Sequence, residues 1–78
     1  MKALITGASS GIGRDMAIDL SNRGYDLILV ARDLEKLQQV KEALKTNVEI
    51  VCMDISKVEN CQKLHEEHKD IDILINNA

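Results

Sequence analysis

The residues best suited to bind a ligand lie in a glycine-rich turn near the start of the chain. The turn reads Thr6-Gly7-Ala8-Ser9-Ser10-Gly11-Ile12-Gly13, between a short apolar run and an amphipathic stretch that begins at Arg14. This order predicts a strand, a tight turn and a helix, and glycines let the backbone approach a ligand closely. A helix start offers unpaired N–H groups and the positive end of the helix dipole. The turn therefore predicts a site for a phosphate or pyrophosphate.

The polar side chains around this turn each have two interpretations. Ser9 and Ser10 could bond to their own backbone as turn formers, or place their hydroxyls against a phosphate or ribose, and we favour binding. Arg14 stands in the first helical turn, where a cation opposes the dipole, so a solvated charge and a phosphate contact both remain open. The residues that we assign to the ligand are Gly7, Ser9, Ser10, Gly11, Ile12 and Gly13.

Apolar runs and helical patterns alternate along the rest of the chain. Strand-like runs cover residues 3–5, 25–31, 48–53 and 71–75. Helical stripes predict buried faces made of Ile12, Met16, Ala17 and Leu20, then Leu34, Leu37, Val40 and Leu44, then Val58, Cys61 and Leu64. Residues 22–24 supply a stop for the first helix, and Ser56 with Glu59 forms a capping box for the third.

The order βαβαβαβ predicts parallel strands joined by right-handed crossovers. We expect an α/β fold with a Rossmann-type open parallel sheet, incomplete at four strands and three helices. The last run, 71–75, would carry an unpaired apolar edge, which natural proteins avoid. We therefore expect residues 1–78 to be the N-terminal half of a larger, dinucleotide-binding domain, or a truncated product that needs a partner to cover this edge. In isolation we expect them to be poorly folded or self-associated.

Composition excludes several other classes of protein. The net charge is −3 and Tyr25 is the sole aromatic residue, which argues against nucleic-acid binding. The apolar run at the N-terminus is too short for a signal peptide or a membrane span, so we expect no membrane partner and a cytoplasmic location with reduced cysteines. His65 and His68 lack the spacing of a zinc-protease motif, and we predict no metal site.

Two further motifs follow the third and fourth apolar runs: Asp54, and Asn76-Asn77-Ala78. With the Thr-Gly-x-x-x-Gly-Ile-Gly turn, this set resembles the classical short-chain dehydrogenase/reductase family along the whole chain. The resemblance implies that the turn holds a nicotinamide dinucleotide. It also implies that Asp54, with Ile55, contacts adenine. One asparagine would tie neighbouring strands, while Asn77 and Ala78 border the cofactor.

Cofactor choice depends on the end of the second apolar run. Ala31 brings no carboxylate that would repel a 2′-phosphate, and the Arg32 guanidinium could bind one, which favours NADP(H). Arg32 could also be an ordinary loop arginine. Asp33 leaves NAD(H) or dual use open, although it suits the N-cap of the second helix. Asp54 could accept a hydrogen bond from the adenine amino group, since Ser56 provides the cap, or serve a capping or strand-end role itself.

The resemblance implies hydride transfer between nicotinamide and a carbonyl or alcohol substrate. The family uses Tyr-x-x-x-Lys with an upstream Ser for proton transfer, whereas Tyr25 is followed four residues later by Leu29. We therefore assign no catalytic residue and predict that the 78 residues alone are inactive. We expect an NADP(H)-binding segment of a homo-oligomeric reductase. The alternative is a non-catalytic dinucleotide-binding module that acts through a partner protein.

Overall fold

The computed structural model describes residues 1–9, 11–54 and 56–77 of the chain. Strands and helices alternate from end to end, which confirms the predicted βαβαβαβ order. The elements are β1 (Lys2–Thr6), α1 (Gly11–Asn22), β2 (Asp26–Ala31), α2 (Leu34–Glu42), β3 (Val48–Cys52), α3 (Val58–Glu67) and β4 (Ile73–Ile75).

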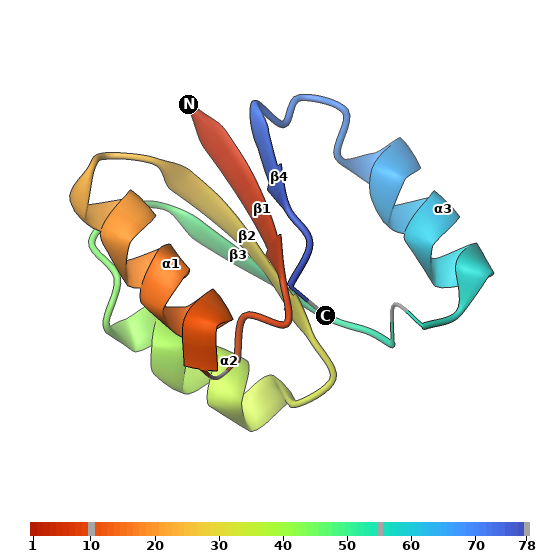
Figure 1. Cartoon of the computed structure of the whole chain (residues 1–78), viewed down its shortest axis with the longest axis horizontal. Coiled ribbons are helices and arrows are strands. Elements are labelled where there is room, and N and C mark those ends of the chain that lie inside the picture. The colour runs from red at the N-terminus through yellow and green to blue at the C-terminus, as the bar shows by residue number, and fades with distance from the viewer. Residues whose placement is uncertain (10, 55, 78) are drawn as a thin grey trace.

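The strands form one parallel sheet in the order β3-β2-β1-β4. Helices α1 and α2 cover one face of this sheet, and α3 lies on the opposite face (Figure 1). The chain moves outward from β1 through β2 to β3 and then crosses to the other side of β1 for β4. Strand order therefore reverses at β1, and in open α/β sheets the crevice at such a point, beyond the carboxyl ends of the strands, is where ligands bind.

The two central strands bury both of their faces. Residues of β1 and β2 alternate between a cluster under α1 and α2 and a smaller cluster under α3, which explains why their sequences read as continuous apolar runs. The first cluster contains Ala3, Ile5, Ala8, Ala17, Leu27, Leu29, Leu37 and Val40. The second contains Leu4, Ile28, Val30 and Leu64.

The predicted helix faces were right for Ala17, Leu37, Val40 and Leu64, which are buried, and wrong for five other residues. Ile12, Met16, Leu34 and Val58 are 67%, 38%, 46% and 71% exposed, and Cys61 is also exposed. Helix α1 instead buries Gly13, Ala17 and Ser21, because small residues at this spacing let its backbone lie close to the sheet. The Ser21 hydroxyl is satisfied there by accepting the N–H of Lys45 at 2.9 Å.

Strand β4 lies at the edge of the sheet next to β1. It is shorter than predicted, since Ile71 and Asp72 belong to the connection from α3, and the Leu74 side chain is 65% exposed. Self-association through this edge stays a prediction. Within residues 1–9, 11–54 and 56–77, no helix has the length and apolarity needed to cross a membrane.

The two leucines of α2 provide a test of this packing. Leu37 is fully buried between α2 and the sheet, whereas Leu34 is nearly half exposed in the first turn of the same helix. We expect Leu37→Ala to lower the free energy of unfolding by about 2–5 kcal/mol, through lost burial and the cavity left behind. Leu34→Ala should cost less than about 1 kcal/mol. Urea denaturation measures both, and equal losses would contradict the packing described.

Candidate functional site

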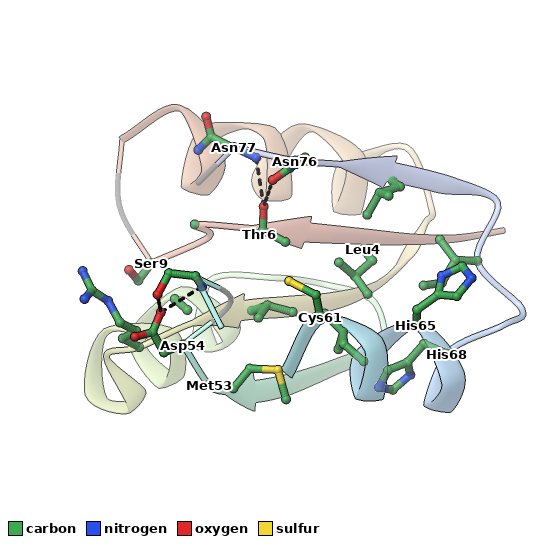
Figure 2. Close-up of a pocket in the computed structure, with 18 of the residues that line it drawn as sticks. Leu4, Thr6, Ser9, Met53, Asp54, Cys61, His65, His68, Asn76 and Asn77 are labelled. Atoms are coloured by element: carbon green, nitrogen blue, oxygen red, sulfur yellow. Dashed lines mark hydrogen bonds between the residues drawn. The ribbon is translucent and has the colours of Figure 1, made fainter. Parts of the chain in front are cut away.

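The carboxyl ends of the strands open onto a cavity of about 1320 Å³ (Figure 2). Residues from every strand end reach it, although they are far apart in the sequence. Of the predicted ligand-binding residues, Gly7, Ser9, Ala31, Arg32, Asp54 and Asn77 line this cavity. Gly11, Ile12 and Gly13 form the first turn of α1 and are not among its lining residues. Ser10, Ile55 and Ala78 fall outside the described residues.

The glycines allow three backbone segments to meet at the end of β1. Gly7 and Gly11 have φ angles of 63° and 60°, values that favour glycine. A Cβ on Gly13 would lie 2.3 Å from the Gly7 carbonyl oxygen and 2.7 Å from Asn77 Nδ2, and one on Gly7 would lie 2.8 Å from the Asn77 carbonyl oxygen. Helix α1 also begins at Gly11, before the predicted start at Arg14, so its first N–H groups belong to the turn itself.

The Thr6 hydroxyl fastens the end of β4 to the end of β1. Its Oγ1 donates to Asn76 Oδ1 at 3.0 Å and accepts the Asn77 N–H at 2.9 Å. Figure 2 shows both bonds meeting at this one oxygen. Thr6 is 5% exposed, so water does not compete freely for these bonds. The predicted tie between neighbouring strands is confirmed, but Thr6 was not assigned a role, since only its place before Gly7 pointed to it.

Arg32 follows β2 directly and lies exposed at the cavity. The end of β3 and the residue after it hold the backbone here. The thiol of Cys52, the last residue of β3, donates to the Arg32 carbonyl oxygen at 3.2 Å, and the Met53 N–H donates to the Ala31 carbonyl oxygen at 3.1 Å. Asp33 caps α2, because its side chain accepts the Lys36 N–H at 3.1 Å. The capping role predicted for Asp33 is confirmed.

Asp54 is half-buried where β3 leads toward α3. Its Oδ1 accepts both the Ser56 hydroxyl at 2.7 Å and the Ser56 N–H at 3.0 Å, while its carbonyl oxygen accepts from Asn60 Nδ2 at 2.8 Å. The two Ser56 bonds hold the pKa of Asp54 below its ordinary value, with smaller contributions from the positive charges of Arg32 and Lys57.

The capping box predicted for Ser56 and Glu59 was wrong. Lys57 is the N-cap of α3 and makes no side-chain capping bond. The Ser56 hydroxyl bonds to Asp54 instead, so Asp54 has a strand-end role of its own.

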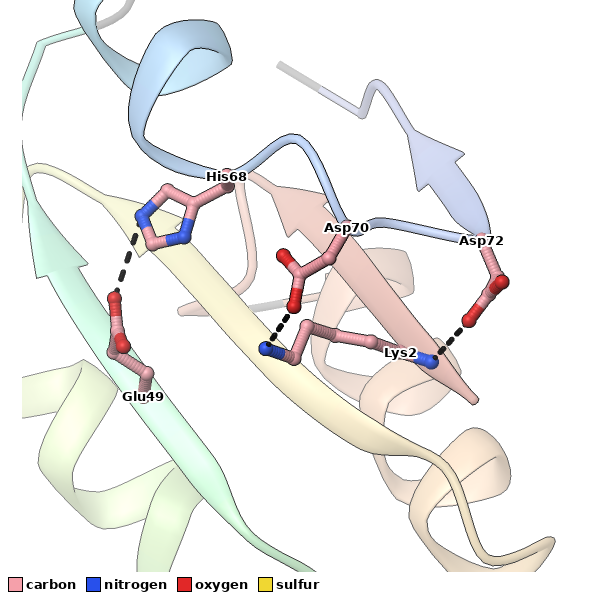
Figure 3. Close-up of polar contacts among 5 residues, drawn as sticks. All are labelled: Lys2, Glu49, His68, Asp70 and Asp72. Carbon is pink, nitrogen blue, oxygen red and sulfur yellow. Dashed lines mark hydrogen bonds and ion pairs between the residues drawn. The ribbon is translucent and has the colours of Figure 1, made fainter.

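Helix α3 forms the far wall of the cavity, with Cys61, Leu64, His65 and His68 among the lining residues. Polar contacts hold its C-cap residue, His68, and the connection from there to β4 (Figure 3). His68 Nε2 lies 3.3 Å from Glu49 Oε2 on β3. Lys2 Nζ lies 2.8 Å from Asp70 Oδ2, and the Lys2 N–H donates to Asp72 Oδ2 at 2.8 Å. In residues 1–9, 11–54 and 56–77, no group of three His, Cys, Asp or Glu side chains could hold a metal ion.

Arg14 lies away from the large cavity. It borders a groove of about 190 Å³ with Ser9, Lys36 and Gln39, and its Nε is 3.9 Å from Asp15 Oδ1. Ser9 also lines the large cavity, so it connects the two. This placement is compatible with either interpretation of Arg14.

Comparison with known proteins identifies the family. The profile described as short chain dehydrogenase matches residues 1–78. The chain belongs to this family. The 11-beta-hydroxysteroid dehydrogenase A of Sesamum indicum shares 40% identity with it, covering 96% of this chain and 24% of that protein. The very-long-chain 3-oxoacyl-CoA reductase of Coccidioides immitis shares 44% identity, covering 97% of the chain and 24% of that protein.

Solved structures of short-chain dehydrogenases superimpose closely on this chain. A metagenomic short-chain oxidoreductase in complex with NADP has a TM-score of 0.87 at 33% identity, covering 100% of this chain and 38% of its own. A short-chain dehydrogenase from Sphingobium yanoikuyae in complex with NADPH has a TM-score of 0.85 at 38% identity, covering 99% of this chain and 33% of its own. These matches confirm the Rossmann-type fold. The chain spans about a quarter of the length of the curated relatives that it matches.

The Thr6 contacts predict a measurable loss of stability. The Thr6→Val variant keeps the shape of the side chain but removes its hydroxyl. We expect it to lower the free energy of unfolding by about 1–3 kcal/mol, because Asn76 Oδ1 and the Asn77 N–H lose their hydrogen-bond partner. Thr6→Ser keeps the hydroxyl and serves as the matched control, with a smaller loss. Thermal and urea unfolding compare the two variants, and a Val variant as stable as the Ser variant would refute the role given to the hydroxyl.

Asp54 predicts a dependence of stability on pH. Its pKa is lower in the folded than in the unfolded chain, so the ionised form stabilises the fold above the unfolded pKa. This contribution to the free energy of unfolding should be lost as the pH falls from about 4, the pKa of aspartate in the unfolded chain, through the lower pKa of Asp54 in the folded chain. Carboxyl ¹³C NMR should show Asp54 titrating below an ordinary aspartate. A midpoint at or above the ordinary value would contradict the hydrogen bonds from Ser56.

Proposed function

We propose that this chain forms the dinucleotide-binding part of an NADP(H)-dependent oxidoreductase that acts on a carbonyl or alcohol substrate. The observation that carries the proposal is the convergence of the glycine turn, Arg32, Asp54 and Asn77 on one cavity at the carboxyl ends of the strands. Membership of the short-chain dehydrogenase family and the NADP and NADPH complexes of similar proteins support it.

The residues present fit such a cofactor. The glycine turn and the first N–H groups of α1 would hold the pyrophosphate, since a helix that begins at Gly11 offers unpaired N–H groups there and its dipole favours an anion. Asp54 and Ile55 would border the adenine. Asn77 and Ala78 would lie along the rest of the cofactor, with Asn77 held by Thr6. When bound, the nicotinamide ring supplies the hydride chemistry.

Arg32 is the basis for preferring NADP(H). It is exposed at the cavity directly after β2, where a guanidinium can bind the adenosine 2′-phosphate through paired, charge-assisted hydrogen bonds. The nearest carboxylate in the sequence, Asp33, accepts the Lys36 N–H as the cap of α2. This bond gives Asp33 a structural reason to be present, which weakens the case for an NAD site. NAD(H) remains the alternative cofactor.

Proton transfer is the part of the reaction that residues 1–78 do not provide in this proposal. Tyr25, the sole tyrosine, lies at the start of β2 with Leu29 four positions later. We therefore propose that the chain is the N-terminal half of its domain, inactive by itself, in a protein that forms homo-oligomers. A non-catalytic dinucleotide-binding module acting through a partner protein is the second candidate.

These candidates make different predictions for the protein expressed from its natural gene. If the protein is an oxidoreductase, a panel of aldehydes and ketones should cause oxidation of NADPH, followed by its absorbance. Binding of NADPH without turnover on any member of the panel, but with a co-purifying protein, would favour the module instead.

The role of Arg32 predicts a loss of affinity that depends on the 2′-phosphate. Arg32→Ala should raise the Kd of NADPH by roughly tenfold or more, because a charge-assisted contact is lost, and change that of NADH by less than about twofold. Arg23→Ala is the matched control, since Arg23 pairs with Asp19 at 3.2 Å near the other end of α1. Calorimetric titration measures the Kd of each cofactor, and equal losses of affinity for NADPH and NADH would refute the assignment.

A further inference from the structure

Three hydrogen bonds restrain Asp54 in the region between β3 and α3. Ser56 directs two donors, its hydroxyl and its N–H, to the same oxygen of Asp54. The Asn60 side chain, from the first turn of α3, holds the Asp54 backbone carbonyl at 2.8 Å. Side chain and backbone of Asp54 are therefore both restrained, by residues that follow it by two and six positions.

We infer that Ser56 is a positioning residue that orients the Asp54 carboxylate toward the 6-amino group of adenine. The inference rests on the proposed function, because it concerns the adenine end of the same cavity. Ser56 itself lines that cavity, and its side chain is exposed. Little packing therefore depends on the hydroxyl, and its short bond to Asp54 is the contact that needs an explanation.

The arrangement suits an amino group in particular. An ionised carboxylate accepts hydrogen bonds and donates none, and it has about four acceptor positions on its two oxygens. Ser56 occupies positions on Oδ1, which leaves Oδ2 with acceptor capacity for a ligand donor. Arg32 and Lys57 are close enough to favour the ionised form as well. A purine with an oxygen at position 6 offers no donor there and would face a negative charge.

Restraint of the carboxylate matters because a free aspartate side chain must lose rotamer freedom when a ligand binds. Because Ser56 already restrains the Asp54 side chain in the free protein, less conformational entropy would be lost when the carboxylate contacts adenine. Thr also carries a hydroxyl and an N–H at the same backbone position, and can replace Ser in this role. Ala keeps the N–H donor alone.

The experiment compares Ser56→Ala with Ser56→Thr in the protein expressed from its natural gene. Calorimetric titration with NADPH and with its hypoxanthine analogue, which has oxygen in place of the 6-amino group, gives the affinities. We expect Ser56→Ala to weaken NADPH binding roughly three- to tenfold, the effect of about one lost hydrogen bond, and to leave the analogue within about twofold. Ser56→Thr should retain most of the affinity for NADPH.

A second comparison shows whether Ser56 acts through Asp54. In an Asp54→Ala background, Ser56→Ala should have no further effect on NADPH binding. In the single Ser56→Ala variant, the NMR titration midpoint of Asp54 should rise toward its ordinary value, because the hydroxyl bond that lowers the pKa is gone.

Three results would overturn the inference. They are equal weakening of NADPH and its analogue by Ser56→Ala, no weakening of either, and a full effect of Ser56→Ala in the Asp54→Ala background. The first would indicate a purely structural role for Ser56. Failure of the unaltered protein to bind both dinucleotides is a different outcome, and it would overturn the proposed function together with this inference.

Discussion

The close approach of three backbone segments at the carboxyl end of β1 determines much of this structure. The turn after β1, the start of α1 and the end of β4 meet there, with so little space that a single carbon atom on Gly13 would overlap the Gly7 carbonyl. Thr6 then supplies the bonds that hold the end of β4 in this position. Because the helix start, the strand ends and the cavity share this junction, its geometry also sets where a ligand can lie.

The sheet gives that junction a rigid base. Strands β1 and β2 are covered on both faces, so neither can shift by a residue without moving buried side chains to the wrong side. Arg32 and the glycine turn follow these two strands directly, and their separation is fixed by the register of Thr6 with Val30. The strands therefore fix the positions of the site residues, while the loops carry the residues that would contact a ligand.

Much of this could be predicted from the sequence, since the signals were local. Continuous apolar runs marked the buried strands, and Asp33 before a helical stripe marked a cap. On α1 the apolar pattern identified Ala17 but not Gly13 and Ser21, because these two residues are buried for their small size and carry little hydrophobic signal. Ser56 illustrates a different difficulty. Its spacing to Glu59 suits a capping box, but Asp54 competes for the same hydroxyl, and only the backbone geometry decides between them.

The bonds made by Thr6 also have a consequence for how the protein folds. Thr6 and Asn76 are 70 positions apart, so the contact closes a loop of that length. Closing so long a loop costs conformational entropy before the contact contributes any stabilisation. Strand β1 also cannot make this contact until β4 has been synthesised. During translation, β1, α1 and β2 can associate early, whereas the junction that shapes the cavity can form only after residues 76 and 77 have left the ribosome. Ligand binding there would then favour the late, completed state over its precursors.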